Sequence, residues 1–190
     1  PQSGLTSLAA IQEANTCGIS LNGLIEYLAD QAGAGEKVLL PAVSNRVEQL
    51  LAGKIDLTVV PEPYVTMGVN QGAVLLATDK DLQVQAAVML FTEEALANKK
   101  EAIAAFYAGY RDSLAYMRET DPKEYIDLVI EKGDFAPEIA EVLQNTVFED
   151  LQFPQEEQFV AILDWMQAKE ELTGNYDFIF AEVADDRFFK

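Results

Sequence analysis

The residues best suited to ligand chemistry follow a short apolar run in the first third of the chain. An amphipathic segment ends at Gly53, a largely apolar run covers residues 55–60, and two prolines flank Glu62, with Tyr64 just beyond. This pattern predicts a helix, a strand and an extended exit that carries Glu62. Because small molecules bind outside the carboxyl ends of strands in open α/β sheets, we expect Glu62 and Tyr64 to meet a ligand. An ordinary strand exit, in which the prolines only end the strand, explains this run equally well when it is taken alone.

A second polar segment stands near the beginning of the sequence. Ser3-Gly4-Leu5-Thr6 precedes apolar residues at helical spacing, which predicts a helix over residues 3–15 with Ser3 as its N-cap. The free N–H groups and hydroxyls of such a helix start favour an anion or a polar oxygen. Plain N-capping explains the same residues and is the more economical interpretation. In α/β folds a strand precedes such a helix, and we expect it upstream of Pro1.

Ser44 and Asn45 form a third polar loop. They follow a predicted strand at residues 38–40 and open a helix that ends at Gly53. If the three polar loops lie at neighbouring strand ends, their groups line one pocket. Such a pocket suits a zwitterion or a polar small molecule better than a dianion, because Glu62 repels a dianion.

The composition argues against several kinds of site. Histidine is absent, which removes the usual general base at neutral pH, the commonest zinc ligand and every histidine-containing triad. The formal net charge is −19, from 13 basic and 32 acidic residues, and the basic residues are scattered, so nucleic acid and anionic membranes are poor partners. The glycines at residues 33–35 lack the spacing of a nucleotide-binding loop, and the acid pairs at 156–157 and 185–186 are typical of solvated surfaces. We therefore expect no metal, no cofactor and no catalytic residue.

Cys17 is the single cysteine, so no internal disulfide can form. We expect it to be a small buried hydrophobic residue near a helix end. No apolar run reaches the length of a membrane span, and no signal peptide is recognisable. Pro1 is not a translation start, so we expect the natural chain to begin upstream of it.

Further elements divide the chain into an α/β part at residues 1–91 and a helical part at residues 92–190. A helix at residues 23–31, capped by Asn22, and strands at 73–77 and 84–91 complete the first part. No flexible linker separates the two parts, so the chain is expected to form a single domain.

The second part shows apolar and aromatic residues at spacings of three and four, which predicts long helices from residue 93 onward. New helices are expected to begin at Pro122, Pro137 and Pro154. The aromatic stripes are interpreted as packing faces. The short aromatic tail at residues 177–190 is expected to dock on the rest of the protein.

Three runs of residues resemble those of bacterial solute-binding proteins. They are Ser3-Gly4-Leu5-Thr6, Val47-Glu48-Gln49-Leu50-Leu51-Ala52-Gly53-Lys54-Ile55-Asp56, and Val60-Pro61-Glu62-Pro63-Tyr64. With residues 88–93 and the helix that follows, the sequence resembles the substrate-binding proteins of ABC importers that have the type 2 periplasmic-binding fold. The branch it is most similar to includes binding proteins for thiamine precursors, aliphatic sulfonates, taurine and nitrate. The likeness spans most of the chain.

This resemblance implies a two-lobed α/β protein that closes on a small polar or anionic metabolite and hands it to an ABC permease. It implies an extracytoplasmic location, either periplasmic or lipid-anchored as a lipoprotein. The segments that open the family's first lobe are missing, so the chain is expected to be an incomplete domain, with one mainly parallel sheet plus C-terminal helices. Taken with the three polar loops, the expected ligand-binding residues are Ser3, Gly4, Leu5, Thr6, Asn45, Glu62 and Tyr64.

Two other functions remain open alongside the solute-binding interpretation. An enzyme on the same fold would need an ionisable group with a shifted pKa inside the cleft, whereas a binder needs only complementarity. A ligand-sensing module would be expected to sit beside a DNA-binding or signalling segment, and the sequence contains none. Non-catalytic binding is therefore the leading hypothesis.

Overall fold

The structure is a computed structural model of the whole chain. It describes residues 3–85, 87–133, 135, 137–146, 149–172, 180, 184 and 187, although the side chain of Asn145 is not included. The chain divides into two compact units, Pro1–Ala86 and Ala87–Lys190, called here unit 1 and unit 2. Each unit is described by itself.

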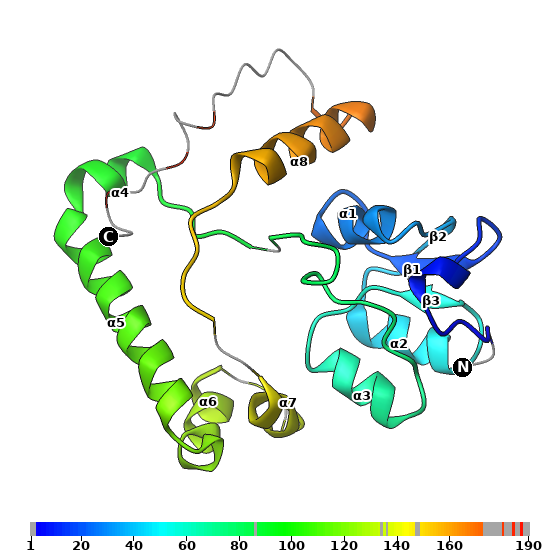
Figure 1. Cartoon of the computed structure of the whole chain (residues 1–190), viewed down its shortest axis with the longest axis horizontal. Helices are drawn as coiled ribbons and strands as arrows, with labels where there is room; N and C mark the ends of the chain where they lie inside the picture. Colours follow the sequence, from blue (N-terminus) through cyan, green and yellow to red (C-terminus); the bar gives the residue numbers. More distant parts are fainter. Residues whose placement is uncertain are drawn as a thin grey trace. The chain divides into compact units, whose positions relative to one another are not determined.

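Unit 1 is a mixed α/β unit built on a small parallel sheet (Figure 1). Its elements, in chain order, are η1 (Leu8–Ala10), β1 (Thr16–Ile19), α1 (Leu24–Gln31), β2 (Glu36–Leu39), α2 (Val43–Leu51), β3 (Leu57–Thr58) and α3 (Tyr64–Asn70). The three strands lie in the order β2-β1-β3 and all pairs are parallel. Because parallel neighbours need a crossover, helices α1 and α2 join the strands.

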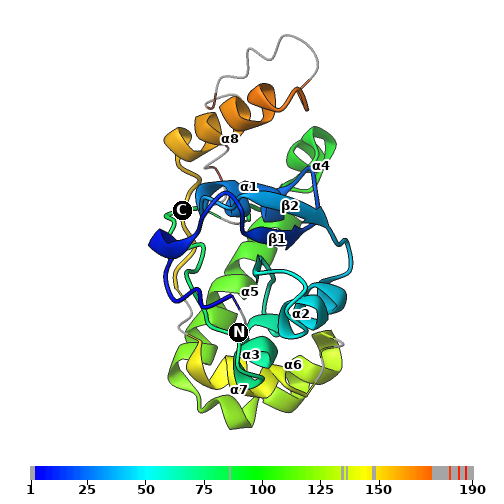
Figure 2. The same ribbon diagram turned by 90° about the vertical axis from the view of Figure 1, so that its right-hand side faces the viewer.

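Helices cover both faces of this sheet. Helix α1 lies on one face, and α2 and α3 lie on the other, as two views at right angles agree (Figure 2). In the register of the sheet, Cys17 of β1 stands beside Lys37 of β2 and Leu57 of β3. The central strand is consequently buried on both sides, which explains its run of small and apolar residues.

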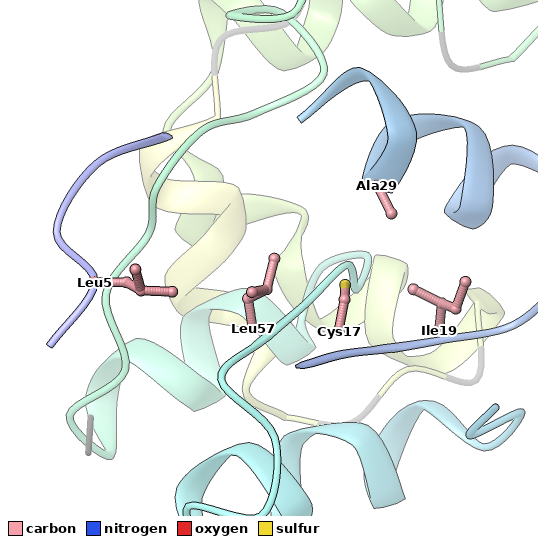
Figure 3. Close-up of a cluster of buried hydrophobic side chains, with 5 residues drawn as sticks. All are labelled: Leu5, Cys17, Ile19, Ala29 and Leu57. Atoms are coloured by element: carbon pink, nitrogen blue, oxygen red, sulfur yellow. The ribbon is translucent and has the colours of Figure 1, made fainter. Parts of the chain in front are cut away.

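The main core of unit 1 lies between the sheet and α1. It consists of Leu5, Cys17, Ile19, Ala29 and Leu57, all of them buried (Figure 3). Cys17 and Ile19 are two residues apart on β1 and therefore point to the same face, where Ala29 of α1 meets them. Leu5 reaches this core from the segment before the sheet, so that segment contributes to packing.

The opposite face of the sheet is fitted to α2. A side chain at Gly18 would place its Cβ 2.6 Å from Cδ1 of Ile55, 3.1 Å from Cδ1 of Leu40 and 3.7 Å from Cγ of Arg46. Glycine at this position therefore leaves room for Ile55 and Leu40 on this face, where Arg46 of α2 lies at an ordinary contact distance.

A carboxylate fastens β1 to the segment that leads into β3. Asp56 Oδ2 accepts hydrogen bonds from the backbone N–H of Thr16 at 2.9 Å and from its hydroxyl at 3.1 Å. The backbone N–H of Asp56 is 3.0 Å from the carbonyl of Thr16. The hydrogen bonds that Oδ2 accepts, above all the one from the backbone N–H of Thr16, hold the pKa of Asp56 below its ordinary value.

Several predicted elements of unit 1 are confirmed. The helices expected at residues 23–31 and 44–53 are α1 and α2, and the strand expected at 38–40 overlaps β2. The apolar run at 55–60 contains β3, which pairs over only two residues. Cys17 is buried as expected, but it lies in strand β1 and not at a helix end.

Three predicted elements are wrong. No helix covers residues 3–15, because Gly4 has a φ of +71° and Leu5 turns into the sheet core, so only the short turn η1 forms. The reason for expecting a strand upstream of Pro1 falls with that helix. The described residues of 73–77 and 84–91 form no strand, since neither segment pairs with the sheet.

Unit 2 is helical in its described part. Its elements are α4 (Glu93–Asn98), α5 (Lys100–Glu119), η2 (Pro122–Glu124), α6 (Ile126–Gly133), α7 (Ile139–Asn145) and α8 (Glu156–Ala168). The predicted breaks at three prolines are confirmed, since η2 begins at Pro122 and α7 and α8 begin two residues after Pro137 and Pro154. Asp121 caps η2 by accepting a hydrogen bond from the N–H of Lys123.

Few of the described residues of unit 2 are buried, and aromatic contacts supply much of the packing among them. Ile103, Tyr125, Ile139 and Leu143 are buried. Phe91, Phe106, Tyr107 and Tyr110 form a chain of ring contacts along α5, with centroids 5.5–6.3 Å apart. In the expected tail, Phe180 contacts the rings of Phe153 and Phe159, whereas residues 178, 179, 188 and 189 lie outside the described residues.

Candidate ligand site at the strand ends

The parallel sheet of unit 1 brings three loops to one edge. They are residues 20–23 after β1, residues 40–42 after β2 and residues 59–63 after β3, and together they define what is called here the strand-end edge. From β1 the chain crosses to β2 on one side and later returns to β3 on the other. The order of connection therefore reverses between β1 and β3, which is where ligands bind in open α/β sheets.

The loop after β1 leaves polar groups free at the start of α1. The N-cap position is Gly23, which provides no side-chain hydrogen bond to the helix. Asn22 has a φ of +61°, and its N–H donates to Oε2 of Glu26 at 2.8 Å. Among the described residues, the side chains of Ser20 and Asn22 have no hydrogen-bond partner. An uncapped helix start with two free polar side chains is suited to hold an anion or a polar oxygen.

The loop after β3 carries the two residues first expected to meet a ligand. Glu62 lies in a turn and is exposed, and its peptide bond to Pro63 is cis. Its carboxylate accepts hydrogen bonds from the N–H of Thr66 at 3.0 Å and from its hydroxyl at 3.2 Å. Tyr64 is half-buried and is the first residue of α3, so the expected extended exit is replaced by a turn. Glu62 thus also caps the first turn of α3 by accepting these two hydrogen bonds.

The loop after β2 leads into α2, which contains Asn45. Asn45 is half-buried, and its Oδ1 accepts a hydrogen bond from Nε2 of Gln49 at 3.1 Å, one turn further along the helix. Ser44 is exposed. Since β2 and β3 are parallel, the topology places the start of α2 at the same edge as Glu62.

The N-terminal segment does not form the helix start that was expected of it. Ser3 Oγ lies 3.5 Å from the N–H of Leu5, within a local turn, and Leu5 is 7 % exposed in the core. Gly4 and Thr6 are exposed. With no helix behind them, these residues offer no dipole or set of free N–H groups for an anion.

Sequence reasoning missed Arg46, which is the most unusual polar residue of this region. It lies on α2 and only 2 % of it is exposed, and its Nη1 donates to the carbonyl of Val59 at 2.8 Å. One signal was present in the sequence, because Arg46 occupies the apolar stripe of α2 beside Val47. A charged residue at such a position is buried with its helix face.

Exposed apolar side chains also lie beside the strand-end edge. Leu21 in the loop after β1, Leu24 at the start of α1 and Leu39 at the end of β2 are 45 %, 40 % and 55 % exposed. Binding sites for small molecules usually combine such apolar surface with a few placed polar groups.

On the α1 face, Lys37 pairs with two acidic side chains, of which Glu26 is buried. Lys37 Nζ lies 3.3 Å from Oε1 of Glu26, which is itself buried, and it is also paired with Asp30. Burial raises the pKa of the Cys17 thiol to about 12, although the charges of Lys37 and Arg46 oppose this. Cys17 is therefore a neutral thiol at physiological pH and a poor nucleophile.

Two features are absent from the residues that the structure describes. These residues contain no group of three or more cysteine and acidic side chains that could hold a metal ion. None of their helices has the length and hydropathy needed to traverse a membrane.

No protein-family model matches the chain, and neither a curated protein nor a solved structure is found to match it. Function is therefore inferred from the geometry and chemistry of the strand-end edge.

Proposed function

We propose that this protein binds a small polar or anionic solute at the strand-end edge of unit 1, without catalysis, as the solute-binding component of an ABC-type importer. The observation that carries the proposal is the uncapped start of α1, with free Ser20 and Asn22 side chains, at the point where the strand connections reverse. Polar donors at such a place suit recognition of a small molecule.

The finer identity of the fold belongs to the same proposal. A small parallel sheet followed by helices is compatible with one lobe of a type 2 periplasmic-binding fold, to which the sequence has a resemblance. On this view the protein acts outside the cytoplasm, free or lipid-anchored, and delivers its solute to an ABC permease.

The chemistry of unit 1 favours binding over catalysis. The chain has no histidine, and the Cys17 thiol is neutral because burial raises its pKa to about 12. The buried carboxylate of Glu26 is held by Lys37 and by the N–H of Asn22. None of these groups is a free general base or nucleophile.

Thermal unfolding of the full chain in the presence of a library of small polar metabolites tests this function. A solute that binds the folded state alone stabilises it by about 2.7 kcal/mol at a hundred times its Kd. We expect a specific solute to raise Tm, and we expect Ser20→Ala combined with Asn22→Gly to abolish that rise. Glycine is chosen at position 22 because it accepts the positive φ of Asn22.

Ser113→Ala is the matched control, since it removes an exposed hydroxyl that bonds only its own helix on α5. It should leave the ligand-induced rise unchanged. A rise that persists in the Ser20→Ala, Asn22→Gly variant would remove the start of α1 from the site. A library in which no compound raises Tm would contradict solute binding by this chain.

A further inference from the structure

Besides the start of α1, unit 1 contains a buried cation, Arg46, without a counter-charge among the described residues. Arg46 is 2 % exposed, and no carboxylate among the described residues forms an ion pair with it. Its Nε is buried and has no hydrogen-bond partner there. Burying a charge in this way is costly, and folded proteins normally pair such a group.

A purely structural role accounts for only part of this arrangement. The bond from Nη1 to the carbonyl of Val59 ties α2 to the chain beyond β3. A guanidinium has five N–H donors and requires acceptors for most of them. A brace to one backbone carbonyl could also be made by a lysine or glutamine, which carry fewer donors. The unpartnered Nε donor of Arg46 therefore points to an acceptor that is not part of the described chain.

The position of Arg46 places this charge at the strand-end edge. Its aliphatic stem passes over Gly18 of β1, and its guanidinium reaches Val59, the first residue after β3. These two strands are neighbours, and the start of α1 lies at the same end of β1. The guanidinium and the uncapped helix start thus belong to one edge of the sheet.

We propose that Arg46 recognises an anionic group of the solute, so that the ligand is a small organic anion with a carboxylate, sulfonate or phosphate group. The planar fork of a guanidinium matches the paired oxygens of such groups. The formal net charge of −19 makes a local counter-charge necessary, because the protein as a whole repels anions. This inference rests on the proposed function and narrows its ligand.

Matched pairs of compounds test the charge preference with the unmodified protein. Each pair consists of a small carboxylate, sulfonate or phosphate monoester and its uncharged amide or alcohol, and the measurements are the rise in Tm and the Kd by calorimetry. We expect anionic members to bind at least tenfold more tightly than their uncharged partners. Uncharged members that bind equally well would overturn this inference and leave solute binding intact, whereas no binding by any compound would overturn both.

Two variants test whether Arg46 is the source of the preference for anionic compounds. Arg46→Met keeps much of the stem that packs over Gly18 and should lose the anion preference, with at least a tenfold rise in Kd. Lys37→Met is the matched control, because it removes the same charge from the other face of the sheet, where Lys37 is paired with Glu26 and Asp30. It should lower stability but leave the ratio of affinities within a pair unchanged.

A spectroscopic measurement keeps the test decisive if Arg46→Met does not fold. The side-chain Nε–H resonance of Arg46, assigned through its loss in Arg46→Lys, is followed in the wild-type protein during titration with the tightest anion. We expect this resonance to move on binding, because the unpartnered donor gains an acceptor. A resonance that stays in place at saturation, or an Arg46→Met variant with wild-type anion affinity, would overturn the role of Arg46.

Discussion

Unit 1 and unit 2 are stabilised in different ways. Of the thirteen buried hydrophobic residues among those described, nine lie in unit 1 and four in unit 2. Unit 1 places them around a parallel sheet that has helices on both faces, whereas those of unit 2 lie on or beside helices. The tightly packed sheet is also the part that carries the polar strand-end edge.

This difference indicates which unit can hold the polar groups of a binding site in fixed positions. A group fixed by a packed sheet and by long-range hydrogen bonds, as Arg46 and Asp56 are, keeps its position with little side-chain entropy left to lose. On α5, by contrast, Phe106 makes ring contacts but stays 45 % exposed. We therefore expect substitutions in unit 1 to affect stability strongly and those on the faces of unit 2 to affect it weakly.

The largest expected effect comes from the core of unit 1. Ile19→Ala should lower the free energy of unfolding by about 2–5 kcal/mol, because Ile19 is fully buried between the sheet and α1. Leu128→Ala on α6 is its control in unit 2, where the side chain is 58 % exposed, and it should change stability by less than about 0.5 kcal/mol. Urea unfolding followed by circular dichroism measures both. Equal losses would break the contrast between the units.

Glycine substitutions should act in opposite directions in the two units. Gly18→Ala should destabilise the protein by about 1–3 kcal/mol, since its Cβ would crowd Ile55 and Leu40. Gly109→Ala should stabilise it by about 0.5–1 kcal/mol, because Gly109 lies inside α5 with open space around it. Denaturation midpoints compare the two variants directly. A stabilising Gly18→Ala would show that Ile55 and Leu40 do not pack closely on β1.

The carboxylate of Asp56 makes the stability of unit 1 depend on pH. Its pKa is lowered in the folded state, so its contribution is present above the unfolded pKa near 3.9 and is lost as the pH falls through the folded value. Asp56→Asn should cost about 1 kcal/mol at pH 7, a modest value because water screens this partly exposed group. The stability cost of Asp56→Asn should shrink towards pH 2, because the wild-type carboxylate becomes protonated there. Urea unfolding at several pH values checks this, and a cost that grows on acidification would contradict it.

Thr16→Val sharpens the same prediction. It removes the hydroxyl that donates to Asp56 but keeps the backbone N–H that bonds the same oxygen. We expect Thr16→Val to lower the free energy of unfolding by less than Asp56→Asn does, with the same dependence on pH.

The smallest effect is expected at Glu62. Its carboxylate accepts two hydrogen bonds from Thr66 at the start of α3, so Glu62→Ala should lower stability by roughly 0.5–1 kcal/mol. Glu62→Gln keeps one carbonyl acceptor and should recover part of this loss. Thermal unfolding without ligand measures both variants. No loss in Glu62→Ala would mean that the carboxylate is free to serve the ligand alone.

Much of the fold of unit 1 follows from local patterns in the sequence. The apolar spacing of α1 and α2 and the turn at Gly53 predict these elements because the same faces pack on the sheet. Strand β1 was not predicted, since Thr16–Ile19 is short and contains a glycine whose close neighbours, Ile55 and Leu40, are distant in sequence. The segment at residues 3–15 shows the converse, because helical spacing is present and tertiary packing of Leu5 overrides it.

The candidate site was less predictable than the fold. Glu62 and Asn45 were predicted as site residues because they follow apolar runs, and the parallel topology places their loops at one edge. Ser20 and Asn22 were missed as site residues because the strand before them was missed. Arg46 was missed because its burial and its unfilled donor depend on contacts with Gly18 and Val59, which are distant in sequence.

The claim on which function depends is that the strand-end edge of unit 1 holds a small solute. Backbone amide NMR of the full chain, titrated with the tightest compound from the library, tests it most directly. We predict that the largest shifts on binding fall on residues 20–25 and 59–62. Shifts confined to the helices of unit 2, with these residues unmoved at saturation, would contradict the assignment.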